Sequence, residues 1–193
     1  PIMRRNRIYD GKMRGVYVHT SGAGLLEEND IFGNIVGVEI ATHANPTLQS
    51  NRIFSSQKSG VTVHDNGQGT LVDDDIYGNA ESGVEVFNLG RPTVRRCRIH
   101  DQVAHGMFFH DDGQGMIEEA DIYGNAQAGV EVTTGSNPSF RSCIVHDQRM
   151  WGFHIWNNGA GNYESNEVKC NALCGFQISQ GGNPILRENQ IQD

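Results

Sequence analysis

Apolar residues alternate with polar ones in short segments that recur at a fixed interval. Residues 60–63 read GVTV, and residues 83–86 read GVEV, 23 positions later. Apolar residues two apart with polar residues between them are typical of a β-strand that buries one face. The same short strand is therefore repeated along the chain, and this repeat determines the fold.

The 23-residue unit extends over the whole sequence. One column of the repeat holds only β-branched aliphatic residues: Ile8, Ile31, Ile53, Ile76, Ile99, Ile122, Val145, Val168 and Ile191. The unit is too short for a strand, a helix and a return connection, so each unit forms one turn of stacked parallel strands about 4.8 Å apart. Parallel crossover connections are right-handed. The sequence thus predicts an all-β fold, a right-handed single-stranded parallel β-helix (solenoid) of about eight coils in one domain, residues 1–193.

Two further columns of the repeat predict local structure. Glycine precedes the longest strand in eight units, at Gly15, Gly37, Gly60, Gly83, Gly106, Gly129, Gly152 and Gly175. This column indicates a positive φ angle or a close backbone approach. Asparagine recurs in one turn, at Asn34, Asn79, Asn125 and Asn171, which predicts a hydrogen-bonded side-chain ladder at a corner of the coil.

Composition narrows the range of partners and compartments. The formal charge is −8, from 23 acidic and 15 basic residues, which disfavours nucleic acid and anionic membranes as partners. The four cysteines are too few for a disulfide scaffold, and free thiols favour a reducing compartment. We therefore expect an intracellular protein, in the cytoplasm or nucleus. The chain begins at Pro1 and ends within a coil, so we expect a fragment of a longer chain whose terminal coils allow end-to-end self-association.

The outward residues of the longest strand carry the candidate chemistry. One outward column reads Tyr17, Glu39, Thr62, Glu85, Phe108, Glu131, His154 and Gln177, and the next reads His19, Ala41, His64, Phe87, His110, Thr133, Trp156 and Ser179. Glu39, Glu85 and Glu131 are the candidate catalytic acids, although a catalytic site usually breaks the repeat rather than recurring with it. Histidines two coils apart are about 9.6 Å from each other by strand spacing, too far to share an ion. We therefore expect no metal site and no cofactor.

The symmetry of this face breaks in the C-terminal half, where aromatic residues gather near histidines. Clustered aromatic residues are typical of binding hot spots. The predicted binding face consists of His19, His64, Phe108, His110, Trp151, His154 and Trp156.

The segments GVYVHTSGAGLLEENDIFGN (15–34), GVTVHDNGQG (60–69) and EEADIYGNAQAGVEVTTGSNP (118–138) resemble parallel β-helix repeats of the CASH type. These repeats occur in carbohydrate-binding proteins and sugar hydrolases. The sequences of these segments are most similar to the β-helix region of the F-box only protein 11 family, whose members are substrate-recognition subunits of ubiquitin ligases. The resemblance implies a β-helix that captures a protein substrate.

Three functional hypotheses follow. The first is a non-catalytic protein-recognition or scaffold module that binds a protein partner around His110, His154 and Trp156. The second is a carbohydrate-active β-helix, binding or hydrolysing a glycan through Glu39, Glu85 or Glu131. The third is an architectural rod. The recurrence of the glutamates favours the first hypothesis over an enzyme.

Overall fold

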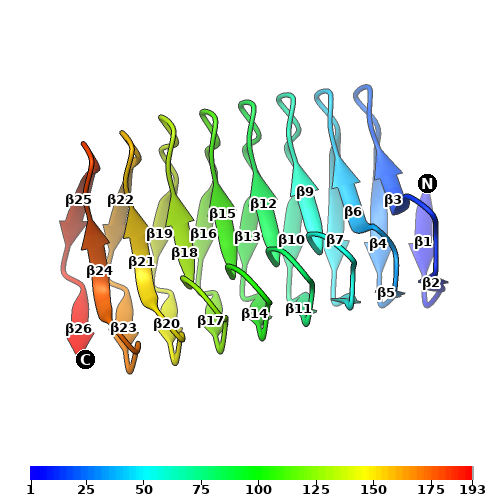
Figure 1. Cartoon of the computed structure of the whole chain (residues 1–193). Helices are drawn as coiled ribbons and strands as arrows, with labels where there is room; N and C mark the ends of the chain where they lie inside the picture. Colours follow the sequence, from blue (N-terminus) through cyan, green and yellow to red (C-terminus); the bar gives the residue numbers. More distant parts are fainter. Residues whose placement is uncertain (193) are drawn as a thin grey trace.

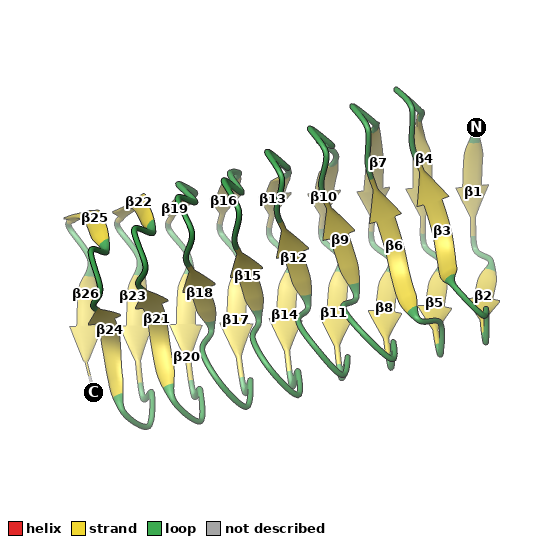
Figure 2. Cartoon of the chain, turned by 45° about the horizontal axis from the view of Figure 1, so that its top comes forward, coloured by secondary structure: helices red, strands yellow, loops and turns green. Residues whose placement is uncertain are grey.

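A computed structural model gives the structure of residues 1–192, and residue 193, the last of the predicted domain, lies outside the described residues. The described residues form 26 short strands and no helix, arranged in three parallel sheets that wind into one solenoid with the N- and C-termini at opposite ends (Figures 1 and 2). The predicted all-β parallel β-helix of about eight coils is therefore confirmed. No helix in residues 1–192 offers the long apolar stretch that crossing a membrane requires.

Each coil contributes one strand to each sheet. Sheet A contains β1 (Ile2–Arg4), β4 (Ala23–Glu27), β7 (Asn45–Gln49), β10 (Thr70–Val72), β13 (Thr93–Arg95), β16 (Met116–Glu118), β19 (Ser139–Arg141), β22 (Ala160–Glu164) and β25 (Asn183–Arg187). Sheet B contains β2 (Arg7–Tyr9), β5 (Asp30–Phe32), β8 (Arg52–Phe54), β11 (Asp75–Tyr77), β14 (Arg98–His100), β17 (Asp121–Tyr123), β20 (Ile144–His146), β23 (Glu167–Lys169) and β26 (Gln190–Gln192). Sheet C contains β3 (Arg14–Val18), β6 (Val36–Ile40), β9 (Val61–Val63), β12 (Val84–Val86), β15 (Met107–Phe109), β18 (Val130–Val132), β21 (Trp151–Ile155) and β24 (Cys174–Ile178).

The register follows the repeat. Ile76 pairs with Ile53 on one side and Ile99 on the other, so the β-branched column forms a vertical stack inside the coil. These isoleucines are fully buried, and burial of each contributes about 1.5–3 kcal/mol. Toward the C-terminus the core becomes aromatic, where Phe140 packs between Phe109 and Phe153 in edge-to-face contacts with centroids 5.9 and 5.4 Å apart.

The glycine column is explained by close approach and not by a positive φ angle. None of the eight glycines adopts positive φ. A Cβ atom built on Gly106 would lie 2.6 Å from the Gly129 carbonyl oxygen and 2.6 Å from Ile122 Cγ2. The backbone enters sheet C so close to the next coil that a side chain cannot be accommodated without a shift.

Two ladders of polar side chains line the corners of the coil. At the corner between sheets B and C, each side-chain oxygen accepts a hydrogen bond from the backbone of the preceding coil, through Asn79, Gln102, Asn125, Gln148 and Asn171. The predicted asparagine ladder is confirmed here. Glutamines fill its alternate steps after Asn79, whereas Ser56 stands at the step between Asn34 and Asn79. At the corner between sheets A and B, a second ladder runs through Asn6, Asn29, Asn51 and Asp74.

Asp74 differs from the other members of the second ladder because it is ionisable. Its carboxyl is buried, and Oδ1 accepts hydrogen bonds from the backbone and the side chain of Asn51 at 2.7 and 2.9 Å. The other oxygen, Oδ2, has no hydrogen-bond partner. Burial raises the pKa of Asp74 from 3.8 to about 7, although the hydrogen bonds from Asn51 act in the opposite direction.

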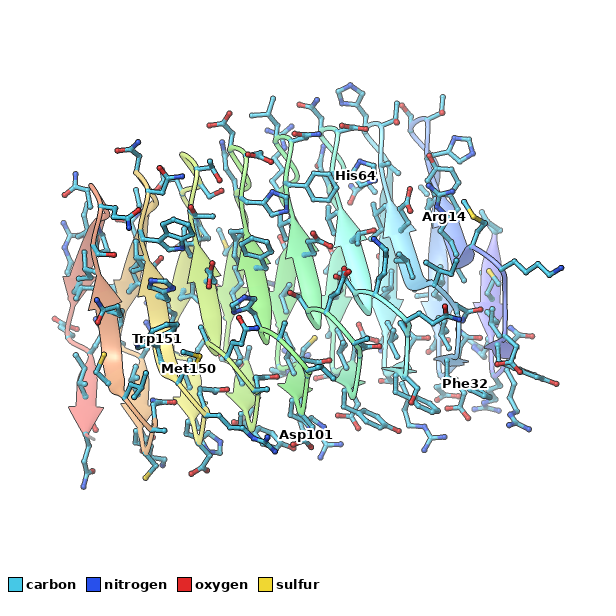
Figure 3. All side chains as sticks on the ribbon, viewed as in Figure 1. Arg14, Phe32, His64, Asp101, Met150 and Trp151 are labelled. Carbon is cyan, nitrogen blue, oxygen red and sulfur yellow. The ribbon has the colours of Figure 1, made fainter. Side chains whose placement is uncertain are left out.

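The outer face of sheet B carries a second regular feature that the sequence analysis missed. Seven rings stack on one another in successive coils: Tyr9, Phe32, Phe54, Tyr77, His100, Tyr123 and His146. Their centroids are 4.6 to 5.3 Å apart, and Phe32 is labelled in Figure 3. Because each inner ring covers the faces of its neighbours, this stack acts as a structural ladder.

Candidate functional site

The outer face of sheet C presents the predicted columns of glutamates, histidines and aromatic residues. Glu39 is 6% exposed, and its carboxylate is held by groups from the coils before and after it. Arg14 donates from Nε to Oε2 at 2.5 Å and from Nη2 to Oε1 at 2.8 Å. His64 Nε2 lies 3.3 Å from Oε1. The carboxylate is therefore fixed by a fork-shaped ion pair and an imidazole.

Glu85 repeats this arrangement two coils further on with different partners. Ser59 Oγ donates to Oε2 at 2.8 Å, and His110 Nε2 lies 3.2 Å from Oε1. The other ring nitrogen of His110 lies 2.9 Å from Asp111 Oδ2. Burial works against both charges, but the contacts of Glu85 with His110 and Ser59 outweigh it and lower the pKa of Glu85. The contacts of His110 with Glu85 and Asp111 likewise outweigh burial and raise the pKa of His110.

The third glutamate, Glu131, lies where the aromatic residues gather. Its carboxylate is 3.4 Å from His105 Nε2 and 3.3 Å from His154 Nδ1, and Trp156 Nε1 donates to it at 3.1 Å. The ring of Trp151 lies 4.4 Å from that of His154. Burial lowers the pKa of His105. Three side chains therefore contact the carboxylate of Glu131, which is 9% exposed, and His105 Nδ1 has no hydrogen-bond partner.

A hollow opens on this face above Thr62. In the outward column that contains Thr62, glutamates alternate with ring-bearing residues, which are Tyr17, Phe108 and His154. Within residues 1–192, Thr62 is the one small residue that stands where this alternation places a ring. Thr62 pairs directly with Glu39 on one side and Glu85 on the other. The absent ring leaves a cavity of about 330 Å³, lined by Arg14, Val36, Glu39, Lys58, Thr62, His64, Glu81, Glu85 and Phe87.

The floor of the hollow has an unsatisfied polar group. Thr62 is 6% exposed, and its Oγ1 atom has no hydrogen-bond partner. Five other buried polar atoms of residues 1–192 also lack a partner, Thr133 Oγ1 among them, so this hydroxyl does not mark a site by itself. On one side of the hollow the ring of His64 stacks on Phe87 with centroids 4.7 Å apart. The hollow thus combines two carboxylates, a hydroxyl and a pair of stacked rings.

The structure brings some of the predicted site residues together and separates others. Glu39, Glu85 and His64 line the hollow. Figure 3 shows Arg14 and His64 in the N-terminal half of the molecule, and Trp151 well apart from them toward the C-terminus. The rings of Phe108 and His110 are tilted by 30° with centroids 4.5 Å apart next to the hollow, whereas His19 stacks on Tyr17 at 4.4 Å at the N-terminal end.

Thr62, Arg14 and Lys58 line the hollow and are not among the site residues predicted from the sequence. The predicted residues lie where the symmetry of the repeat breaks by the addition of large aromatic residues. The relevant break is the loss of a ring at Thr62, and the alternation of glutamate and ring in that column is the signal that could have found it. Among residues 1–192, no group of three or more His, Cys, Asp or Glu side chains is placed to hold a metal ion.

Comparison with known proteins defines the family. The right-handed β-helix family matches residues 82–193, more than half of the chain, and the protein belongs to this family. Residues 2–127 also match the family described as periplasmic copper-binding protein (NosD). Comparison with curated proteins gives no match.

Several solved structures share the fold. The periplasmic alginate epimerase AlgG is 12% identical with a TM-score of 0.81, and the match covers 95% of this chain and 50% of that one. The A-module of the mannuronan C-5 epimerase AlgE4 of Azotobacter vinelandii is 18% identical with a TM-score of 0.76, covering 95% and 60%. Pectate lyase Pel9A is 11% identical with a TM-score of 0.68, covering 97% and 68%. The chain therefore spans 50% to 60% of the length of the two epimerases.

These matches correct two expectations from the sequence. The expectation of a non-catalytic protein-recognition module of the F-box type is wrong, because the matching β-helices are carbohydrate-acting proteins and a copper-binding family. The comparisons support the resemblance to parallel β-helix proteins, and they do not show a closeness to F-box only protein 11. The expectation of an intracellular location is also wrong, because residues 2–127 match a family described as periplasmic. The intracellular location was inferred from the free cysteines. Two of the four, Cys97 and Cys143, are buried in the core, so their free thiols carry no information about redox conditions.

Proposed function

We propose that this protein is a carbohydrate-active β-helix that acts outside the cytoplasm and holds a sugar ring in the hollow above Thr62. The observation that carries the proposal is the missing ring, since the hollow lies where neighbouring coils place a ring and is flanked by Glu39 and Glu85. The solved structures that share the fold are named for their action on alginate, mannuronan and pectate, which are all polysaccharides.

The hollow suits a sugar because it offers an apolar wall and polar groups that converge. Phe87 stacks between His64 and His110, so it presents the edge of its ring to the hollow, and an apolar face of a pyranose ring can contact this edge. The hydroxyl groups of the sugar can donate to the carboxylates of Glu39 and Glu85, which line the hollow. Ligand-binding sites commonly combine such a wall with a few fixed polar groups.

The same two carboxylates are poorly suited to hydrolysis by themselves. Glu39 and Glu85 are two coils apart, about 9.6 Å by strand spacing, at the upper edge of the roughly 6.5–9.5 Å separation of inverting glycosidases. Such enzymes need a protonated general acid, whereas the contacts with His110 and Ser59 lower the pKa of Glu85. Glu85 therefore serves as an acceptor for sugar hydroxyls.

The match to NosD raises copper as a ligand, and the donor set does not fit it. Copper prefers imidazole and thiolate ligands. The ring nitrogens of His64 and His110 are both engaged by carboxylates, and no three donors converge in residues 1–192. We derive no role for copper.

Filling the hollow should abolish glycan binding and leave the fold intact. Thr62→Phe places a ring where Phe108 already stands in an equivalent position, so the coil accommodates it. We expect at least a tenfold loss of affinity, about 1.4 kcal/mol, for whichever oligosaccharide the wild type binds in a panel of neutral, amino and uronic acid oligosaccharides.

The matched control is Gln177→Phe, which adds the same ring to the same column at the far end of the face. This variant should bind like the wild type, and thermal unfolding should show that both variants are folded. A Thr62→Phe variant that binds as tightly as the wild type would rule out the hollow as the site.

A further inference from the structure

We propose, building on the carbohydrate-binding function above, that the ring in the hollow is a neutral or amino sugar and not a uronic acid. Neutral and amino sugars both present hydroxyl or amino groups that donate hydrogen bonds, and neither carries a carboxylate. This inference concerns the class of sugar, which the likeness to alginate and pectate proteins leaves open because identities of 11–18% reflect the fold alone.

The charges around the hollow favour such a ligand. The lining contains two cationic residues, Arg14 and Lys58, and three acids, Glu39, Glu81 and Glu85, so the net charge is −1 with His64 neutral. A uronate in the hollow would bring its carboxylate close to the carboxylates of Glu39 and Glu85, which flank the hollow. Repulsion between like charges in a partly desolvated site strongly weakens binding. The two glutamates therefore select against a sugar ring that carries a carboxylate.

Neither cation is free to neutralise a substrate carboxylate. Arg14 gives both arms of its guanidinium to Glu39, and this geometry is the strong, bidentate form of the ion pair. Lys58 lies 3.8 Å from Glu81, and its side chain is 58% exposed. An exposed lysine of this kind is screened by water and salt, so it attracts a carboxylate only weakly.

The unused hydrogen-bonding capacity points to donors on the ligand. An ionised carboxylate has about four acceptor positions and no donor. Glu85 accepts from Ser59 and His110, which leaves acceptor positions unfilled. The O–H or N–H groups of a ligand can fill these positions, whereas a carboxylate on the ligand offers no donor. A neutral or amino sugar therefore suits Glu85.

The test is calorimetric titration with three hexasaccharides, a β-1,4-glucan, a chitosan and an oligogalacturonate, against the wild type and Thr62→Phe. We expect the glucan or the chitosan to bind at least tenfold more tightly than the oligogalacturonate, and Thr62→Phe to lose this binding. Added salt distinguishes an amino sugar from a neutral sugar. Screening by salt weakens the binding of a cationic amino sugar and leaves the binding of a neutral sugar unchanged.

Lys58→Ala supplies a second readout that does not disturb the core, because the Lys58 side chain is exposed. It removes a positive charge from the lining of the hollow, so it should tighten the binding of the cationic chitosan, whereas a site that recognises a carboxylate through Lys58 would lose oligogalacturonate binding and gain none for chitosan. Preferential binding of oligogalacturonate that Thr62→Phe abolishes would overturn the sugar class and leave the proposed function standing. Absence of binding to all three would overturn both.

Discussion

Replacement of Asp74 by asparagine should stabilise the protein strongly above pH 7 and only slightly below pH 4. In the folded state the pKa of Asp74 is raised to about 7 from 3.8, so the folded protein holds this proton more tightly than the unfolded chain does. The free energy of unfolding of the wild type therefore falls as pH rises from about 4 to 7. A rise of this size in the pKa of Asp74 lowers the free energy of unfolding at neutral and higher pH by at most about 4 kcal/mol.

Asparagine also completes the ladder. Asn29 and Asn51 each donate from Nδ2 to the carbonyl oxygen of a residue one coil earlier, Met3 and Leu26. The equivalent acceptor for position 74 is the carbonyl oxygen of Leu48, and Asp74 Oδ2, which occupies the donor's place, has no partner. Denaturant titrations of Asp74→Asn at several pH values should show a nearly constant stability across this window.

The control is Asp73→Asn, one residue away. Asp73 is exposed, pairs with Arg96 and adopts a positive φ angle that asparagine tolerates. This variant should retain the pH dependence of the wild type. If Asp74→Asn shows the same loss of stability between pH 4 and 7 as the wild type, another group is responsible.

Substitution of Gly106 by alanine should destabilise the protein by about 3 kcal/mol. The added Cβ would lie 2.6 Å from a backbone oxygen of the next coil and 2.6 Å from the buried Ile122 side chain, so the strand entering sheet C must shift. Overpacking of this kind typically costs about 1–3 kcal/mol and sometimes more. In a protein of this size, each kcal/mol lowers the melting temperature by roughly 2–4 °C.

A glycine in open space provides the comparison. Gly78 has φ of +61°, and nothing lies within 4 Å of a Cβ built on it. Asparagine tolerates this conformation, so Gly78→Asn should change stability by less than about 1 kcal/mol. Equal melting temperatures for Gly106→Ala and Gly78→Asn would contradict close approach as the reason for the glycine column.

The fold could be predicted because it depends on the repeated residues. The isoleucine column around Ile76 fixed the register, since identical coils must place identical side chains in the same position inside the solenoid. The asparagine ladder at Asn79 and Asn125 was predicted for the same reason. Features that alternate chemically were missed, such as the glutamines within that ladder and the mixed phenylalanine, tyrosine and histidine stack on sheet B.

The site was harder to predict because it is defined by a missing group. Trp151, His154 and Trp156 stand out in the sequence, but in the structure they pack on one another and on Glu131. Thr62 is unremarkable in the sequence, and its importance depends on what the neighbouring coils place beside it. The identities of Glu39 and Glu85 were predicted, whereas their place on either side of a hollow required the side-chain packing.

The most direct test of the account is a crystal structure of the protein with the hexasaccharide that binds best in the titrations. We predict a sugar ring in the hollow above Thr62, with ring hydroxyl or amino groups within hydrogen-bond distance of the carboxylates of Glu39 and Glu85. A sugar bound instead over Trp151 and Trp156, with the hollow unoccupied, would contradict it.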